Sequence, residues 1–142
     1  MNRRKMLCIV IASGLLGLSG NAAAQGRVSD KDVEQLMKNL KDESEKFSDS
    51  FKKDLSKSTI RNTSAEKSAK QVAERFPKQV EGMLKQFKDK KKADAAIPAV
   101  YQSYNELDKL MGKISPTAKT TDSWSRVQQS LKQIAKAVNY TP

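Results

Sequence analysis

The sequence predicts an all-α protein, an antiparallel up-down four-helix bundle, and three observations lead to this fold class. Apolar residues recur every three or four positions in four separate segments, the spacing that places them on one face of a helix. No segment alternates apolar and polar residues over the length of a strand, and no Asn-Gly or Asp-Gly turn occurs. The connections between the four segments are short, which favours antiparallel neighbours.

The chain has 142 residues, and residues 1–24 have the features of a cleavable export signal. Basic residues occupy positions 3–5, an apolar run extends from Met6 to Leu18, and Ala22 to Ala24 offer the small residues that a signal peptidase accepts. The apolar run is shorter than the about 20 residues that cross a bilayer. We therefore expect export, by the general or the twin-arginine route, and one helical domain over residues 25–142 that is periplasmic or extracellular.

The first predicted helix covers residues 30–57. Ser29 and Asp32 resemble a capping box with Asp in place of the usual Glu, and acidic residues in the first turn suit the positive end of the helix dipole. Its apolar stripe consists of Val33, Leu36, Met37, Leu40, Phe47, Phe51 and Leu55. The stripe is polar in its middle, where the inward positions fall on Glu43 or Ser44.

The second predicted helix covers residues 64–91, with Ser64 as its N-cap. Pro77 interrupts its hydrogen bonding but not its apolar register, because Phe76 and Val80 are still four positions apart. A proline in a helix interior costs about 3 kcal/mol, since it removes an N–H donor and its ring crowds the preceding turn. We therefore expect this helix to be kinked or broken at Pro77.

The third predicted helix covers residues 95–114. It either takes Asp94 as its cap or begins with Pro98 in its first turn, where a proline is tolerated, and Gly112 marks its end. The fourth predicted helix covers residues 122–139. Its inward positions form an almost strict apolar seam of Trp124, Val127, Leu131, Ile134, Ala135 and Val138. The sequence thus predicts two long helices followed by two shorter ones.

Two tyrosines bring polar groups to the inward face of the third helix. The hydroxyl groups of Tyr101 and Tyr104 need hydrogen-bond partners if the side chains are buried. Glu43 and Ser44, at the polar gap of the first helix, are candidates to supply them across the bundle. Two interpretations are open: a polar waist that fixes the helix register, or a small cleft that holds a ligand or an extended peptide.

The residue types argue against catalysis and metal binding. The chain contains no His, and its one Cys, Cys8, lies within the predicted export signal. This excludes His-based acid–base catalysis, thiol nucleophiles and His- or Cys-ligated zinc from the mature domain. Glu43 and Glu45 are two positions apart, so they do not face each other on a helix as paired catalytic carboxylates would. We expect no enzyme activity, cofactor, metal or disulfide.

Charge is the strongest feature of the composition. The chain has 27 Lys and Arg and 16 Asp and Glu; removing the three basic residues of the signal leaves 24 against 16, a formal charge of +8. The densest cluster is Lys85, Lys88, Lys90, Lys91 and Lys92, at the end of the second helix. This cluster is either a binding site for polyanions or a favourable set of charges at the negative end of the helix dipole, beside acids of the first helix.

These observations predict an exported, small, basic helical protein of binding or structural type, a monomer or weak homo-oligomer. Its expected partners are anionic lipid headgroups or envelope polymers. The alternative is a periplasmic chaperone-like or stress protein that shields unfolded protein clients. We do not expect sequence-specific nucleic-acid binding, because Arg is scarce after the signal and the aromatic residues fall on apolar stripes.

Overall fold

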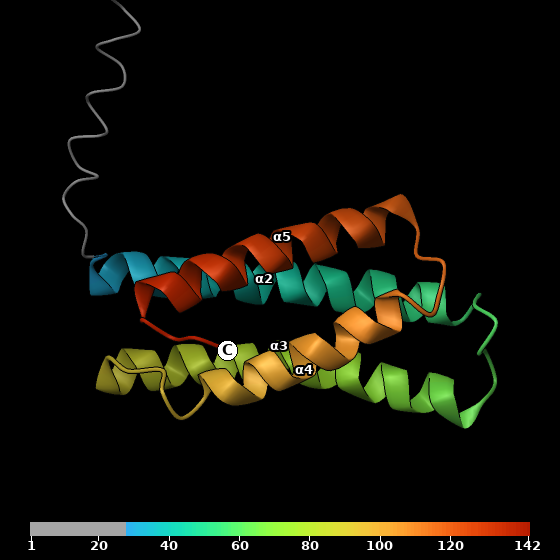
Figure 1. Ribbon diagram of the computed structural model, residues 1–142, viewed down its shortest axis with the longest axis horizontal. Helices are drawn as coiled ribbons and strands as arrows, with labels where there is room; N and C mark the ends of the chain where they lie inside the picture. Colours follow the sequence, from blue (N-terminus) through green and yellow to red (C-terminus); the bar gives the residue numbers. More distant parts are fainter. Residues whose placement is uncertain (1–27) are drawn as a thin grey trace, which may run out of the picture.

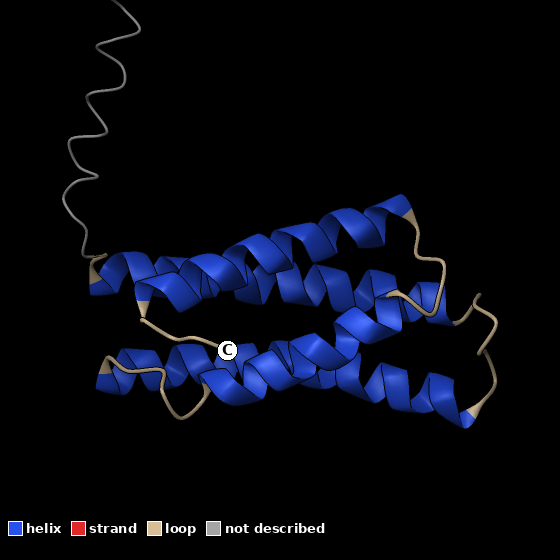
Figure 2. Cartoon of the chain, in the orientation of Figure 1, coloured by secondary structure: helices blue, strands red, loops and turns tan. Residues whose placement is uncertain are grey.

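The computed structural model describes residues 28–142, and this part of the chain contains four α-helices and no strands (Figure 2). The helices are α2 (Asp30–Leu55), α3 (Ser64–Lys90), α4 (Ile97–Met111) and α5 (Ala118–Ala137). The all-α prediction is confirmed, and the arrangement is consistent with a four-helix bundle. The predicted export signal, residues 1–24, lies outside the described residues.

Helix α2 contacts α5 on one side and α3 on the other, and α3 also contacts α4. Figure 1 shows α2 beside α5 and α3 beside α4, with connection 91–96 at one end of the molecule and connections 56–63 and 112–117 at the other. The α-carbons of α4 and α5 stay more than 8 Å apart although these helices are consecutive in the chain. Side chains rather than close backbone approach therefore close the edge between α4 and α5.

The core is built from the apolar stripes that the sequence predicts. The largest fully buried side chains include Phe47, Phe51, Phe76, Met37, Leu40, Leu107, Leu131 and Ile134. Burying a side chain of this size stabilises the fold by about 1.5–3 kcal/mol. Among the described residues, Val28 is the one large hydrophobic side chain that is exposed.

The cap of α2 agrees with the prediction, and the cap of α3 differs by one residue. The Ser29 Oγ atom accepts a hydrogen bond from the backbone N–H of Asp32 at 3.1 Å. Thr63 rather than Ser64 is the N-cap of α3, because its Oγ1 atom accepts the backbone N–H of Glu66 at 3.2 Å. Of these two residues, only Thr63 is followed three positions later by an acidic residue, as a capping box requires.

Helix α3 is continuous through Pro77, so the predicted break into two pieces is absent. The ring fixes a backbone angle that suits a helix, and the missing N–H leaves only the Ala73 carbonyl without its usual intrahelical donor. Phe76 and Val80 flank the proline and are both fully buried. Core packing on either side of Pro77 thus holds the helix together.

The start of α4 matches one of the two predicted positions, whereas the start of α5 differs from the prediction. Helix α4 begins at Ile97 with Pro98 in its first turn, whereas the other candidate, Asp94, is exposed and does not cap it. Helix α5 begins at Ala118, four residues before the predicted start, and Thr117 is its N-cap. The reason lies on another helix, since the Asp54 carboxylate of α2 binds Thr117, the N-cap residue of α5.

Candidate functional site

The five lysines of the predicted polyanion site are all exposed at the C-terminal end of α3, but they do not share one face. Successive residues of an α-helix are about 100° apart, so Lys85 and Lys90 point in directions that differ by about 140°. Lys91 follows the helix with a left-handed backbone (φ 55°) that turns the chain. The cluster therefore surrounds the end of α3 instead of forming a stripe along it.

Lys91 is the member of this cluster that the protein itself uses. Its Nζ atom lies 3.2 Å from the Glu34 carboxylate of α2 and 6.0 Å from the centroid of the Phe87 ring. This ion pair fits the structural interpretation of the cluster, in which acids near the start of the first helix pair with its lysines. The other four, Lys85, Lys88, Lys90 and Lys92, form no ion pair with any residue in 28–142.

An open cleft of about 1350 Å³ lies at the same end of the bundle. Its walls are the first turns of α2, the connection 91–96 and the last turns of α5. Its apolar lining includes Val33, Leu36, Phe87, Ala93 and Val138, and its charged lining comprises Lys91, Lys92, Lys136, Asp30, Asp32 and Asp94. Because the charged lining is balanced, this cleft does not select anions by charge alone.

Of the four residues of the predicted polar waist, Glu43, Ser44 and Tyr104 have polar partners, while the second carboxylate oxygen of Glu43 is buried without one. Ser44 is fully buried and its Oγ atom donates to the Lys41 carbonyl at 2.8 Å, while Glu43 pairs with Lys46 at 3.4 Å. The hydroxyl of Tyr104 accepts a hydrogen bond from the Gln128 side chain of α5 at 3.1 Å. A ligand cleft formed by Glu43, Ser44, Tyr101 and Tyr104 stays a prediction.

Aromatic rings fill the space between α4 and α5. We define the aromatic seam as Tyr101, Tyr104, Trp124 and Tyr140. The rings of Tyr104 and Trp124 stack with centroids 5.0 Å apart, and Tyr101 meets Tyr104 edge-on at 5.9 Å and Tyr140 at 5.2 Å. Burial raises the pKa of the Tyr101 phenol, and the neighbouring phenols of Tyr104 and Tyr140 raise it further.

The aromatic seam continues into the core and ends in a polar contact. The Trp124 ring lies 4.6 Å from Phe47 and 6.3 Å from Phe76, measured between centroids. Its indole N–H donates to the Asp108 carboxylate of α4 at 3.0 Å. This bond satisfies the one polar group of a nearly buried tryptophan and links α5 to α4.

A buried polar cluster at the opposite end of the bundle was not predicted. The Asp54 carboxylate of α2 accepts the backbone N–H of Thr117 at 2.9 Å and the Thr117 hydroxyl at 3.1 Å. Beside it, the Ser50 and Thr120 hydroxyls are hydrogen-bonded at 2.5 Å. Asp54 and Thr117 are 63 positions apart, so no local motif could have indicated the contact. The one sequence sign is an acidic residue next to the inward-facing Leu55.

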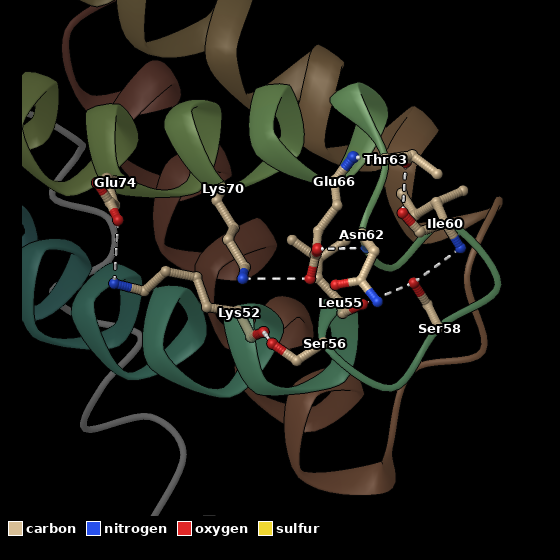
Figure 3. A network of polar contacts seen from close by, with 10 residues as sticks. All are labelled: Lys52, Leu55, Ser56, Ser58, Ile60, Asn62, Thr63, Glu66, Lys70 and Glu74. Atoms are coloured by element: carbon tan, nitrogen blue, oxygen red, sulfur yellow. Dashed lines mark hydrogen bonds and ion pairs between the residues drawn. The ribbon is translucent and has the colours of Figure 1, made fainter.

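The turn between α2 and α3 carries a polar network (Figure 3). The Glu66 carboxylate accepts the backbone N–H of Asn62 at 2.8 Å and pairs with Lys70 at 3.1 Å. These contacts lower the pKa of Glu66, the bond from Asn62 having the larger effect. One turn further, Lys52 of α2 lies 3.5 Å from Glu74 of α3. The network fixes how α3 begins.

A small polar hollow of about 440 Å³ lies between α3 and α4. Arg75 donates to the Glu106 carboxylate at 3.0 Å and to the Ser103 hydroxyl at 3.3 Å. Ser103, which is buried, donates in turn to the Gln79 side chain at 2.5 Å. These groups bind one another, so the polar contacts around the hollow link α3 to α4.

Residues 28–142 contain neither a cluster of metal-ligand side chains nor a helix suited to cross a membrane. No three His, Cys, Asp or Glu side chains lie together as metal ligands would. No helix in this range combines the length and apolar character needed to cross a bilayer. Comparisons with protein-family models, curated proteins and solved structures find no match to this chain.

Proposed function

We propose that this protein is exported and binds anionic surfaces, such as lipid headgroups or envelope polymers, through exposed lysines and not by insertion of apolar side chains. The observation that carries the proposal is the set of four exposed lysines at the end of α3 that lack an ion pair within residues 28–142. These four lie within eight positions of the chain, Lys85 to Lys92, so their charges act together on one end of the molecule, whereas Lys91 between them is paired with Glu34.

The expected affinity is low and depends on salt. Each lysine near an anionic surface contributes about 1 kcal/mol, so the four together contribute about 4 kcal/mol. That free energy corresponds to a dissociation constant of about 1 mM. The attraction extends over about 8 Å at physiological ionic strength. Binding of this strength suits reversible attachment to a surface that presents many charges.

The distribution of apolar side chains supports this function over the alternative of a client-shielding chaperone. A chaperone of that kind exposes a contiguous apolar patch of several hundred Å². Among the described residues, Val28 is the one exposed side chain that is large and apolar. A non-catalytic role also fits the polar clusters, because the carboxylates of Asp54, Glu66 and Glu106 are each engaged by a partner inside the fold.

We also infer that the four helices are antiparallel and that Pro77 bends α3. Contacts between α2 and α3 support the direction: Glu34 pairs with Lys91 and Lys52 pairs with Glu74, so the residue number falls along α3 as it rises along α2. The bend is expected because the helix lacks one hydrogen bond at Pro77. The four helices together form a compact rod, and the C-terminal end of α3 presents the lysines at one end of this rod.

A pair of matched variants tests the surface-binding proposal. Replacing Lys85, Lys88, Lys90 and Lys92 with Glu should abolish sedimentation with anionic vesicles at low salt. The control variant carries Glu at four other exposed lysines: Lys57, Lys109, Lys113 and Lys119. The change in net charge is the same, but these positions lie away from the C-terminal end of α3. It should retain most of the binding.

Two results would contradict this function. In one, the unaltered mature protein ignores vesicles of phosphatidylglycerol and also anionic polymers at low salt. In the other, both variants lose binding equally, which would assign the effect to net charge and not to the end of α3. Circular dichroism confirms that each variant keeps its helix content.

A further inference from the structure

We propose that the aromatic seam between α4 and α5 is a binding site for an extended peptide that carries an aromatic side chain. The C-terminal segment, Val138–Pro142, occupies this site as an intramolecular ligand. The proposal rests on the geometry of the seam and is independent of the lysines and of anionic surfaces.

The first step is that the seam lies where the backbones of α4 and α5 are far apart. Helices α4 and α5 face each other across an edge where their α-carbons stay more than 8 Å apart, whereas α2 approaches both α3 and α5 more closely. Half-buried Tyr101 and Tyr104 on α4 and nearly buried Trp124 on α5 fill the space from the two sides. The edge between α4 and α5 is therefore closed by aromatic side chains, and a ring that leaves it can be replaced by another ring without a change in the helix backbones.

The second step is the path of the C-terminal segment. Helix α5 ends in a turn in which the Val138 N–H donates to the Ile134 carbonyl at 2.9 Å and the Tyr140 N–H to the Ala135 carbonyl at 2.8 Å. Asn139 takes the left-handed backbone conformation (φ 58°) that reverses the chain at a helix end. In Figure 1 the C-terminus consequently lies between α5 and the pair formed by α3 and α4.

The third step is what the segment contacts. The Tyr140 ring lies 5.2 Å from the Tyr101 ring, with an angle of 31° between their planes. Thr141 and Pro142 are exposed, and neither forms a hydrogen bond with another residue in 28–142. The segment is therefore held by the turn at the helix end, by the Tyr101 ring and by packing of Val138 and Tyr140 against the core, and a peptide of similar sequence offers the same aromatic contact.

The chemistry of the site indicates its ligand. When Tyr140 leaves, the side of the Tyr101 ring that it covered faces solvent, while Tyr104 stays stacked on Trp124. Aromatic pairs of this geometry favour a ring over an aliphatic side chain of similar size. A short extended segment with Tyr or Phe, flanked by small or polar residues as Tyr140 is, matches the vacated position.

The test uses Trp124, the one tryptophan in the sequence, as a reporter. A chain ending at Asn139 is titrated with a synthetic acetylated peptide, Ala-Val-Asn-Tyr-Thr-Pro, which copies Ala137 to Pro142, and the indole N–H resonance is followed by NMR. We expect truncation to shift this resonance and the peptide to move it back towards its position in the intact chain. The intact protein should bind the peptide at least tenfold more weakly, because its own segment competes.

Control measurements separate recognition of the ring from non-specific effects. A peptide with Ala in place of Tyr should leave the indole resonance of the truncated chain unchanged. Tyr140→Phe in the intact chain should keep the resonance near its original position. If the truncated chain loses helix content, Tyr140→Ala in the full-length protein replaces it under the same criteria. The proposal is overturned if removal of Tyr140 leaves the resonance in place, or if the peptide binds the intact and altered chains equally or binds neither.

Discussion

Asp54 of α2 binds Thr117, the N-cap residue of α5, which lies 63 positions after it: the Asp54 carboxylate accepts the backbone N–H of Thr117 at 2.9 Å and the Thr117 hydroxyl at 3.1 Å. Helix N-termini normally take their cap from the residue just before them, whose side chain accepts an N–H of the first turn. In α5 the Thr117 side chain makes no such bond. The contact therefore ties the start of α5 to the end of α2 and sets the register of these two helices.

Removing this carboxylate should destabilise the fold. Asp54→Ala leaves the Thr117 N–H and hydroxyl without their partner, and we expect the free energy of unfolding to fall by about 1–3 kcal/mol. Urea unfolding followed by Trp124 fluorescence measures the change. The control is Asp49→Ala, at an exposed position of the same helix, which should change stability by less than about 0.5 kcal/mol. Equal effects of the two substitutions would show that the Asp54 contact does not stabilise α5.

Leu131 tests whether α5 is packed as an integral part of the core. Its side chain is only 1% exposed. Leu131→Ala should lower the free energy of unfolding by about 2–5 kcal/mol, because it removes buried methyl groups and leaves a cavity. Thermal unfolding by circular dichroism provides the measurement, with Lys132→Ala on the exposed neighbour as the control. A Leu131→Ala variant that melts like its parent would mean that α5 contributes little to the fold.

Glu66 makes stability depend on pH. Its pKa is lowered in the folded state, chiefly by the hydrogen bond from the Asn62 N–H, so the ionised carboxylate stabilises the fold. This contribution is present above the ordinary pKa of glutamate and disappears as the pH falls through the lower, folded-state value. Glu66→Gln should therefore lower the urea midpoint at neutral pH, and the difference from the parent should vanish well below pH 4.5, the ordinary value. A difference that stays constant down to acid pH would assign the effect to shape and not to charge.

Pro77 should limit the stability of α3. Pro77→Ala supplies the N–H that the Ala73 carbonyl lacks, and the helix is already continuous at this position. We expect a gain of about 1 kcal/mol, part of the about 3 kcal/mol that an interior proline costs. Scanning calorimetry measures the gain, and small-angle scattering detects any change of shape. Loss of stability on substitution would indicate that the proline itself is needed to close the bundle.

Features encoded by neighbouring residues could be predicted from the sequence. The cap at Ser29, the apolar stripes and the position of Pro98 in the first turn of α4 all depend on residues within a few positions of one another. The periodicity places the same side chains inward whichever helices become neighbours. Fold class and core residues were therefore accessible without the structure.

Features that depend on contacts between helices could not be predicted. The start of α5 is set by Asp54, and the partner of the Tyr104 hydroxyl is Gln128 on α5, not a residue of α2. The five lysines looked like one cluster in the sequence, yet only Lys91 finds a carboxylate of α2. The periodicity of apolar residues predicts which face of a helix is buried, but not which residue of another helix lies opposite it.

The most direct test of the proposed surface binding is a salt titration of residues 25–142 on anionic vesicles. Attachment through exposed lysines predicts measurable binding to phosphatidylglycerol vesicles at about 0.01 M salt, where charges interact over about 30 Å. Binding should be nearly abolished at about 1 M salt, where that distance falls to about 3 Å, and absent from zwitterionic vesicles throughout. Binding that persists at high salt, or that does not distinguish the two kinds of vesicle, would contradict attachment by charge.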